Sequence, residues 1–512
     1  MNRREFLRTA GVVGGATFVG WPTLIDLESS ARAASRAPTL GEPQVPPDSV
    51  LNSPASECPV DTIVVLTMEN RSFDHYFGHL AADEQYLNEG RRRYGKSFAI
   101  NGKIDLHYRD VAGNKVATTH IQKLGDEPNP FRGCLHNDPG HSWKASRKQR
   151  DTGFLGPGTG NDHFAVGYYR SEDVPVQTSL ARRFTVMDRH HASLLGPTWP
   201  NRQYLYSAQS EGLKGAPKPL DVGAYSGETI FDRLAQAGVQ AREYFFNIPA
   251  AAIWGARMSP YIRSMDQYFF DAVRGELPSV TFLTPGMGTP FRTDDHPQGD
   301  ITLGQRFIQA VFATFVRSPQ WQRGMFVLTY DEHGGFYDHV KPPVVPDDRA
   351  SKNDEKNFGQ LGFRVPSVLA SPYAPRNYVD HTLYDHTSIL RFLEWRFLGA
   401  PPQGPGRDGD NWFLTTRDRN ANTYGAALRS GDPDPEVDLE APLANIPLVS
   451  NDCNHDQRLR QTGKDNQVTP FDVSDELETL AAQVDPDGVT FTPWLKATDV
   501  RDMPAVPDDR PR

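Results

Sequence analysis

The chain has 512 residues, with 54 basic and 64 acidic side chains and a formal net charge of −10 at pH 7. This acidic balance argues against nonspecific nucleic-acid binding, which needs a basic face to neutralise phosphates. Three cysteines are too few for a disulfide scaffold, and an odd number cannot all pair within one chain. The sequence leaves open which two of them pair.

The N-terminus predicts an export signal over residues 1–33. Arg3 and Arg4 precede a weakly apolar run at residues 9–21, which is too short to span a membrane, and Ala31-Arg32-Ala33 offers a cleavage site. Paired arginines before such a run resemble a twin-arginine signal. We therefore expect export by the twin-arginine machinery to a periplasm, the cell envelope or the medium. Peripheral contact of the mature protein with a membrane is compatible with this expectation.

Residues 34–59 are rich in proline and have little periodicity, so they are predicted to be a linker. Continuous apolar runs at residues 61–67, 279–283, 325–329 and 366–370 predict strands buried on both faces. Between them, apolar residues recur at helical spacing, as at residues 307–317 and 387–398. Alternating strands and helices predict an α/β sandwich around a mainly parallel sheet, with a catalytic domain at residues 60–400. The polar residues 401–512 are predicted to be an extension that covers this domain.

Two of the predicted strands run directly into polar clusters. Glu69 and Asn70 follow the first strand, and Asp331 and Glu332 follow the strand at residues 325–329. Active-site groups of open α/β sheets lie just beyond the carboxyl ends of strands. Carboxylate and amide oxygens suit a hard divalent cation, and nearby histidines would also suit zinc or iron. The sequence therefore predicts a divalent metal site but leaves the identity of the metal open.

A third segment places a hydroxyl near a sharp turn. Gly196-Pro197 precedes Thr198, and Pro200 is predicted to open a helix as its first residue. Backbone N–H groups at a helix N-terminus favour a developing anion, and a metal would lower the pKa of the hydroxyl. Thr198 is therefore a candidate nucleophile, although the same pattern is equally typical of a threonine that only caps the helix.

Three long motifs carry a family resemblance: ENRSFDHYFG at residue 69, GPTWPNR at residue 196 and TYDEHGGFYDHV at residue 329. Together they resemble the bacterial phosphoesterase family of phospholipases C and their acid-phosphatase relatives, over about residues 60–400. The resemblance implies an alkaline-phosphatase-like α/β sandwich that cleaves phosphoester bonds. It also implies the roles of site residues: Glu69, Asn70, Asp331 and Glu332 around a metal, Thr198 as nucleophile, His141 and His296 near the phosphoryl oxygens, and His339 and His386 at motif positions of less defined role.

A threonine at position 198 favours the phospholipase branch, since the acid-phosphatase relatives carry serine there. We therefore expect a phospholipase C that cleaves phosphatidylcholine-like lipids through a phosphothreonine intermediate, with His141 or His296 as general acid. One alternative is an acid phosphatase with broad monoester specificity. A second alternative, from another class, is a noncatalytic exported protein that binds phosphate or lipid.

Overall fold

Strand β1 (Thr62–Met68) lies in the middle of the main sheet, and each of its seven residues is buried. The computed structural model describes residues 45–122, 133–134, 136–217, 223, 225–287, 292–402, 404 and 412–437. β1 pairs in parallel with β10 (Gly324–Tyr330) on one side and with β9 (Val280–Thr284) on the other. Apolar and β-branched residues on both faces suit a strand that is covered on both sides.

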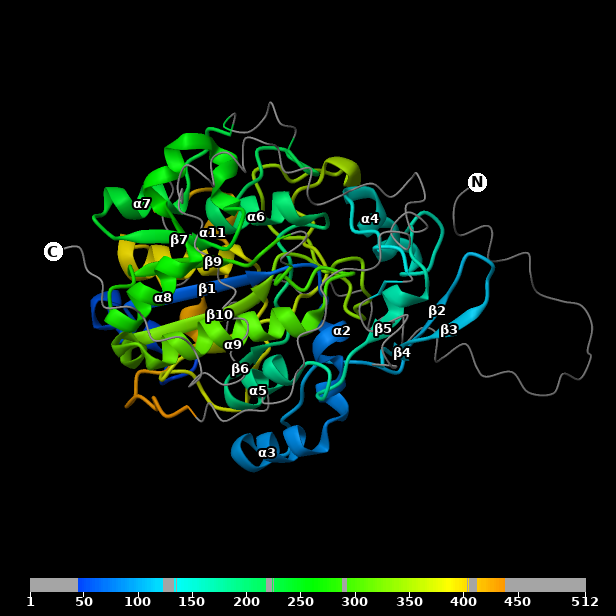
Figure 1. Ribbon diagram of the computed structural model, residues 1–512, viewed down its shortest axis with the longest axis horizontal. Coiled ribbons are helices and arrows are strands. Elements are labelled where there is room, and N and C mark those ends of the chain that lie inside the picture. Colours follow the sequence, from blue (N-terminus) through cyan, green and yellow to red (C-terminus); the bar gives the residue numbers. More distant parts are fainter. Residues whose placement is uncertain are drawn as a thin grey trace, which may run out of the picture. The chain divides into compact units, whose positions relative to one another are not determined.

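Within the described ranges, the main sheet has eight strands in the order β12-β6-β11-β10-β1-β9-β7-β8 (Figure 1). The flanking strands are β6 (Thr185–Met187), β7 (Ala241–Phe245), β8 (Ile262–Ser264), β11 (Val368–Ala370) and β12 (Tyr378–Asp380). In this sheet β11 runs antiparallel to both β10 and β6, whereas the other neighbouring pairs are parallel. The predicted α/β architecture with a mainly parallel sheet is confirmed.

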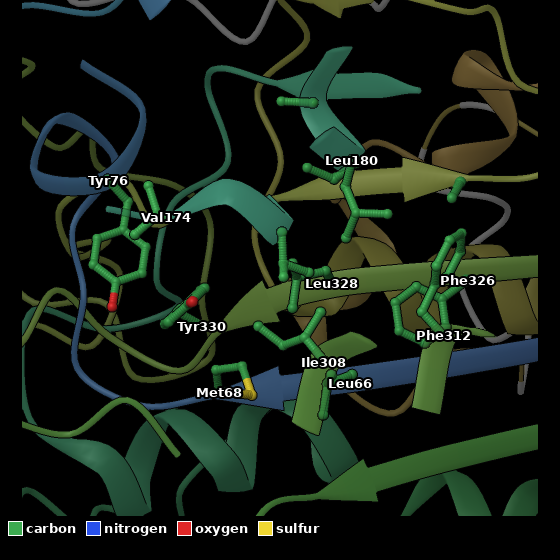
Figure 2. Close-up of a cluster of buried hydrophobic side chains, with 14 of the residues drawn as sticks. Leu66, Met68, Tyr76, Val174, Leu180, Ile308, Phe312, Phe326, Leu328 and Tyr330 are labelled. Atoms are coloured by element: carbon green, nitrogen blue, oxygen red, sulfur yellow. The ribbon is translucent and has the colours of Figure 1, made fainter. Parts of the chain in front are cut away.

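Helices cover both faces of the sheet, and alternate residues of β1 point to the two sides. Val64, Leu66 and Met68 belong to one core cluster, and Ile63 and Val65 belong to another. The first cluster includes residues of α2 (Phe73–Phe77), α5 (Pro175–Arg183), α8 (Met265–Arg274) and α9 (Ile301–Arg317). The second includes residues of α6 (Thr198–Ser207), α7 (Ile230–Gln236) and α10 (Thr387–Leu393). Figure 2 shows part of the first cluster, where Ile308 and Phe312 lie against Leu66, Leu328 and Phe326.

Several smaller elements lie outside the main sheet. They are α3 (Glu84–Tyr94), α4 (Trp143–Thr152), α11 (Thr416–Arg419), the hairpin of β2 (His107–Arg109) with β3 (Lys115–Ala117), and β4 (Thr119–His120) paired with β5 (Gly167–Tyr168). No helix among the described residues is long and apolar enough to cross a membrane. Cys58 is a buried free thiol, and Cys134 is bonded in a disulfide.

The four predicted strands correspond to β1, β9, β10 and β11, and residues 307–317 lie in α9. The predicted helix at residues 387–398 consists of α10 and one π-helical turn, Glu394–Leu398. Of the predicted linker, Val50, Leu51 and Cys58 are buried in the same core cluster as α10. The signal peptide and most of the C-terminal extension lie outside the described residues, so the predicted domain boundaries stay predictions.

Candidate active site

The carboxyl ends of β1 and β10 bring the two predicted ligand pairs together. Met68 is in register with Tyr330, so Glu69 and Asp331 leave the sheet side by side. The backbone N–H of Asn70 donates to Asp331 Oδ1 at 3.1 Å. Asn70 has a left-handed backbone with φ of 59°, which asparagine tolerates better than most residues. This bend lets Glu69 and Asn70, which are consecutive in the chain, both lie against Asp331.

Helix α6 positions the candidate nucleophile. Thr198 is the first residue of the helix and Pro197 is its N-cap, so the helix begins two residues before the predicted start at Pro200. The Thr198 hydroxyl is buried and donates to Glu69 Oε2 at 3.0 Å. No side chain makes a capping hydrogen bond at this helix N-terminus. The hydroxyl is therefore directed at the carboxylate cluster, and the capping-only interpretation of Thr198 is wrong.

The three acidic side chains of the cluster are shielded from water, and their negative charges repel one another when they are ionised. Glu69, Asp331 and Glu332 are each fully buried. Burial, together with the neighbouring Asp331 carboxylate, raises the pKa of Glu69 well above its usual value. Burial also raises the pKa of Asp331 to about 6 and that of Glu332 to about 7. Such a cluster favours the binding of a cation, because a cation offsets the cost of ionising these groups in a dry site.

The side-chain amide of Asn70 lies between these carboxylates and His296. One end of the amide is 2.9 Å from Glu332 Oε1 and 3.2 Å from Glu69 Oε2, and the other end is 2.9 Å from His296 Nε2. Burial lowers the pKa of His296 well below its usual value, so the ring is neutral and carries one proton. Which nitrogen holds that proton therefore decides the orientation of the amide.

His296 Nδ1 lies 3.1 Å from the carbonyl oxygen of Pro297, to which it can donate. Arg292 Nη1 is farther from Nδ1, at 3.4 Å, and already donates to the same carbonyl at 2.7 Å. A proton on Nδ1 leaves Nε2 as an acceptor for the Asn70 amide nitrogen. The Asn70 oxygen then faces Glu332 Oε1 and Glu69 Oε2, so three oxygens converge at this point.

This donor set fits a hard divalent cation. It consists of carboxylate and amide oxygens, which such cations prefer. Asp331 Oδ2 is buried and has no hydrogen-bond donor among the described residues. The structure thus brings Glu69, Asn70, Asp331 and Glu332 into one cluster whose oxygens could hold a cation.

His141 lies next to this cluster and carries a different charge from His296. Its Nδ1 is 2.7 Å from the Pro139 carbonyl, and its Nε2 is 4.0 Å from Glu332 Oε1 with no hydrogen-bond partner among the described residues. Burial opposes protonation, but the carboxylates of Glu332 and Asp138 outweigh it and raise the pKa of His141 to about 9. His141 is therefore a proton donor at neutral pH, whereas His296 is not.

Sequence reasoning missed three residues at this site. Asp138 places a ligand atom within 4.8 Å of those of His141 and His296, so this trio is a second group able to hold a cation. Asp294 is fully buried, and its carbonyl accepts from the Glu69 N–H at 2.8 Å. Arg202 donates to Glu69 Oε1 at 2.7 Å. Arg202 lies in the GPTWPNR motif and Asp138 lies three residues before His141, but the direction of a side chain is not visible in sequence spacing.

His339 and His386 have other partners. His339 Nδ1 is 2.5 Å from Asp74 Oδ2 and Nε2 is 3.0 Å from Asn101 Oδ1, in a network that also contains Arg364. His386 Nε2 is 2.9 Å from the carbonyl oxygen of Tyr330, the residue before Asp331. Burial lowers the pKa of His386 to about 4. The contacts of His386 suit a neutral ring that supports the end of β10.

The sequence of this chain matches known proteins over the segments that form the site. Residues 60–398 match the sequence model of the Phosphoesterase family. The chain belongs to this family. The phosphoesterase is therefore a hydrolase that acts on phosphoester bonds, as the motifs predicted.

Several curated relatives cover most of the phosphoesterase. It is 33% identical over 408 residues to non-specific phospholipase C6 of Arabidopsis thaliana, which covers 72% of each chain. It is 27% identical over 468 residues to phospholipase C A of Mycobacterium tuberculosis, with 80% of this chain and 83% of the relative covered. A solved protein of the alkaline phosphatase superfamily from Vibrio parahaemolyticus is similar over 54% of this chain and 72% of its own, with a TM-score of 0.28 and 10% identity.

Proposed function

We propose that this phosphoesterase is an exported, metal-dependent phospholipase C that cleaves phosphatidylcholine-like lipids. The observation that carries the proposal is the hydrogen bond from Thr198 to Glu69, which directs a hydroxyl into a cluster of carboxylates. Relatives named as phospholipases C, at about 30% identity over most of the chain, support the substrate class. Threonine at position 198 supports the diesterase over the monoesterase alternative.

The proposed cation is held by Glu69, Asn70, Asp331 and Glu332. When bound, it supplies Lewis acidity that lowers the pKa of the Thr198 hydroxyl and offsets negative charge on the phosphoryl oxygens. The position of Thr198 at the start of α6 adds backbone N–H groups that favour an anion. Together these features explain why a threonine, normally a weak nucleophile, attacks phosphorus here.

The reaction proceeds in two displacements. Thr198 Oγ1 passes its proton toward Glu69 Oε2 and forms a bond to phosphorus, while the bond from phosphorus to the diacylglycerol oxygen breaks. Protonated His141 gives its proton to that leaving oxygen, so diacylglycerol departs as a neutral alcohol. In the second displacement the now neutral His141 takes a proton from water while the water oxygen bonds to phosphorus and the bond from phosphorus to Thr198 Oγ1 breaks. Thr198 recovers its proton from Glu69, and the phosphorylated head group leaves. The neutral His296 holds the Asn70 amide and donates no proton.

The test compares hydrolysis of a chromogenic phosphorylcholine diester and of the matching phosphate monoester by the full mature chain. We expect the diester to be cleaved faster and the reaction to stop when a chelator removes the cation. Thr198→Ala should lower kcat by about 10³-fold or more, since it removes the nucleophile. Thr198→Ser keeps a hydroxyl at the same place and should retain measurable turnover.

Each other outcome points to a specific alternative. Cleavage of the monoester alone would replace the proposal with an acid phosphatase of broad specificity. Full turnover by Thr198→Ala would remove the phosphothreonine intermediate. Activity that resists exhaustive chelation would remove the divalent cation from the mechanism.

Export by the twin-arginine machinery is a separate part of the proposal. It is supported by Arg3 and Arg4 before a weakly apolar run, in a segment outside the described residues. Replacing both arginines with lysines should keep the full-length protein in the cytoplasm, and fractionation of the cells measures this directly. Unchanged export of that variant would contradict the proposed route.

A further inference from the structure

Arg202 is a buried cation in contact with the predicted metal ligands. Its side chain is 1% exposed. Nη2 donates to Glu69 Oε1 at 2.7 Å, and Nε lies 3.8 Å from Asp331 Oδ2. The sequence motif and the comparisons assign no role to this arginine. Removing a guanidinium from water costs desolvation free energy, and the attraction of the neighbouring carboxylates offsets that cost.

Helix α6 contacts both oxygens of one carboxylate. Thr198 and Arg202 are four residues apart, so their side chains lie on the same face of the helix, one turn from each other. Thr198 donates to Oε2 of Glu69 and Arg202 donates to Oε1. Because each oxygen has its own donor, the Glu69 carboxylate is held in one rotamer. Oε2 is thereby fixed as the oxygen that faces the nucleophile and the Asn70 amide.

The charges of the cluster also support a role for Arg202 in binding the cation. Glu69, Asp331 and Glu332 carry three negative charges when ionised, and Arg202 contributes one positive charge in contact with two of them. His141, 4.0 Å from Glu332, adds a second positive charge when protonated, and the Asp138 carboxylate beside it adds a fourth negative one, so an excess of negative charge remains for a cation. A neutral side chain in place of the guanidinium would leave the Glu69 and Asp331 carboxylates without this positively charged contact.

We propose that Arg202 is a positioning residue that fixes the Glu69 carboxylate and thereby sets both the cation affinity of the site and the alignment of Thr198. This inference rests on the proposed function, because it requires a cation at these carboxylates. A purely structural role is the competing explanation, since Nη2 also donates to the Thr67 carbonyl at 3.0 Å and ties α6 to β1.

Two substitutions separate these explanations. Arg202→Gln removes the charge, and Arg202→Lys keeps it but replaces the planar fork with a single ammonium. On the full chain stripped by a chelator, calorimetric titration with Mn²⁺ should give about 10- to 100-fold weaker binding for Arg202→Gln, the usual effect of losing a residue that orients a metal ligand. Arg202→Lys should recover part of this affinity. For the chromogenic diester, kcat should fall in both variants by a larger factor than KM rises.

Arg391 provides a matched control. It is also 1% exposed, and its Nη2 donates to the carbonyls of Pro401 and Gly404, away from the carboxylate cluster. Arg391→Gln should lower the unfolding temperature in the presence of chelator while Mn²⁺ affinity stays within twofold of wild type. A structural role for Arg202 predicts the same pattern for Arg202→Gln.

The outcomes are distinguishable. Mn²⁺ affinity and kcat unchanged in both Arg202 variants, with a wild type that binds Mn²⁺ and hydrolyses the diester, would overturn this inference alone. A wild type that binds no cation would overturn the proposed metal site and this inference together. If Arg202→Gln does not fold, Arg202→Lys decides: wild-type affinity and kcat would count against a positioning role, and a several-fold loss of both would support it.

Discussion

At the scale of single residues, two buried histidines beside the same carboxylates differ in charge: His141 is protonated and His296 is neutral. His141 faces Glu332 and Asp138, which raise its pKa to about 9 in spite of burial. Burial, with Arg292 nearby, lowers the pKa of His296 well below the usual value. Pairs of groups whose pKa values are pushed apart commonly divide acid and base roles. The general acid that the sequence left undecided between these two residues is therefore His141 in our mechanism.

This assignment predicts the alkaline limb of the pH profile. The active form is protonated, so kcat/KM for the diester should fall about tenfold per pH unit at alkaline pH. Because a bound cation opposes the carboxylates that raise the pKa of His141 to about 9, this fall should begin at or below that pH. His141→Asn should lower kcat by about 10²- to 10⁴-fold and remove this limb. His381→Asn is the control, because Asp188 also raises the pKa of His381, which lies outside the cluster. A wild-type profile that stays flat to pH 10 would contradict the role of His141.

The cluster of Glu69, Asn70, Asp331 and Glu332 could be predicted because each pair directly follows a strongly apolar strand. Strand ends are visible in sequence, and parallel strands bring their ends to one edge. Arg202 could not be predicted in the same way, because only the rotation of α6 shows that it reaches Glu69. The network of His339 with Asp74 likewise depends on a contact between distant segments. The predicted role of His339 stays a prediction.

At the scale of elements, the turn after β10 is fixed by a close approach of two backbones. Gly334 has φ of +61°, and a Cβ built there would lie 2.0 Å from the carbonyl oxygen of Asn70. The N–H of Gly334 also donates to Glu332 Oε2 at 2.7 Å. The turn thus holds the Glu332 side chain and the bend at Asn70 at once.

We expect Gly334→Ala to displace this turn and to lower both stability and kcat. Gly113, at the tip of the β2–β3 hairpin, is the matched control, since it has φ of +85° but no neighbour within 4 Å of a built Cβ. Gly113→Ala should cost only about 1–2 kcal/mol of left-handed strain and leave kcat unchanged. Chemical denaturation and initial rates measure the two effects. Equal behaviour of the two variants would show that the close approach at Gly334 has no consequence.

The direction of a strand in the sheet was harder to predict than its position in the sequence. The run at residues 366–370 predicted a buried strand, and β11 is buried, but its antiparallel direction depends on its pairing with β10 and β6. An apolar run reports burial and carries no information on direction. The start of α6 was predicted at Pro200, whereas Pro197 already supplies the N-cap. Proline is compatible with several positions in the first turn, so its presence alone does not fix the first residue.

At the scale of the whole molecule, the buried carboxylates link stability to pH and to the cation. Folding raises the pKa of Glu332 from 4.5 to about 7 and that of Asp331 from 3.8 to about 6. Carboxyls with raised pKa values contribute their stability fully below about pH 4 and lose it as the pH rises to about 7. A bound cation favours the ionised forms and cancels this loss.

The difference in unfolding temperature between cation-loaded and chelator-stripped protein should therefore grow as the pH rises from 4 to 7. With cation at 100 times its dissociation constant, the gain in stability at pH 7 is about 2.7 kcal/mol, which corresponds to a few degrees. Differential scanning calorimetry of the full chain at each pH measures it. A difference that is constant or shrinks over this range would contradict a cation at these carboxylates.

The register of β1 against β10 has a consequence for biosynthesis. The two halves of the carboxylate cluster follow strands that are adjacent in the sheet but separated in sequence by residues 69–323. A nascent chain has no partner for this side of β1 until β10 has left the ribosome, and pairings of such long range form slowly. Most of residues 60–398, which match the Phosphoesterase family, must therefore be synthesised before β1 can pair with β10. A translocation route that accepts completed, folded proteins suits a chain whose reactive centre cannot assemble segment by segment.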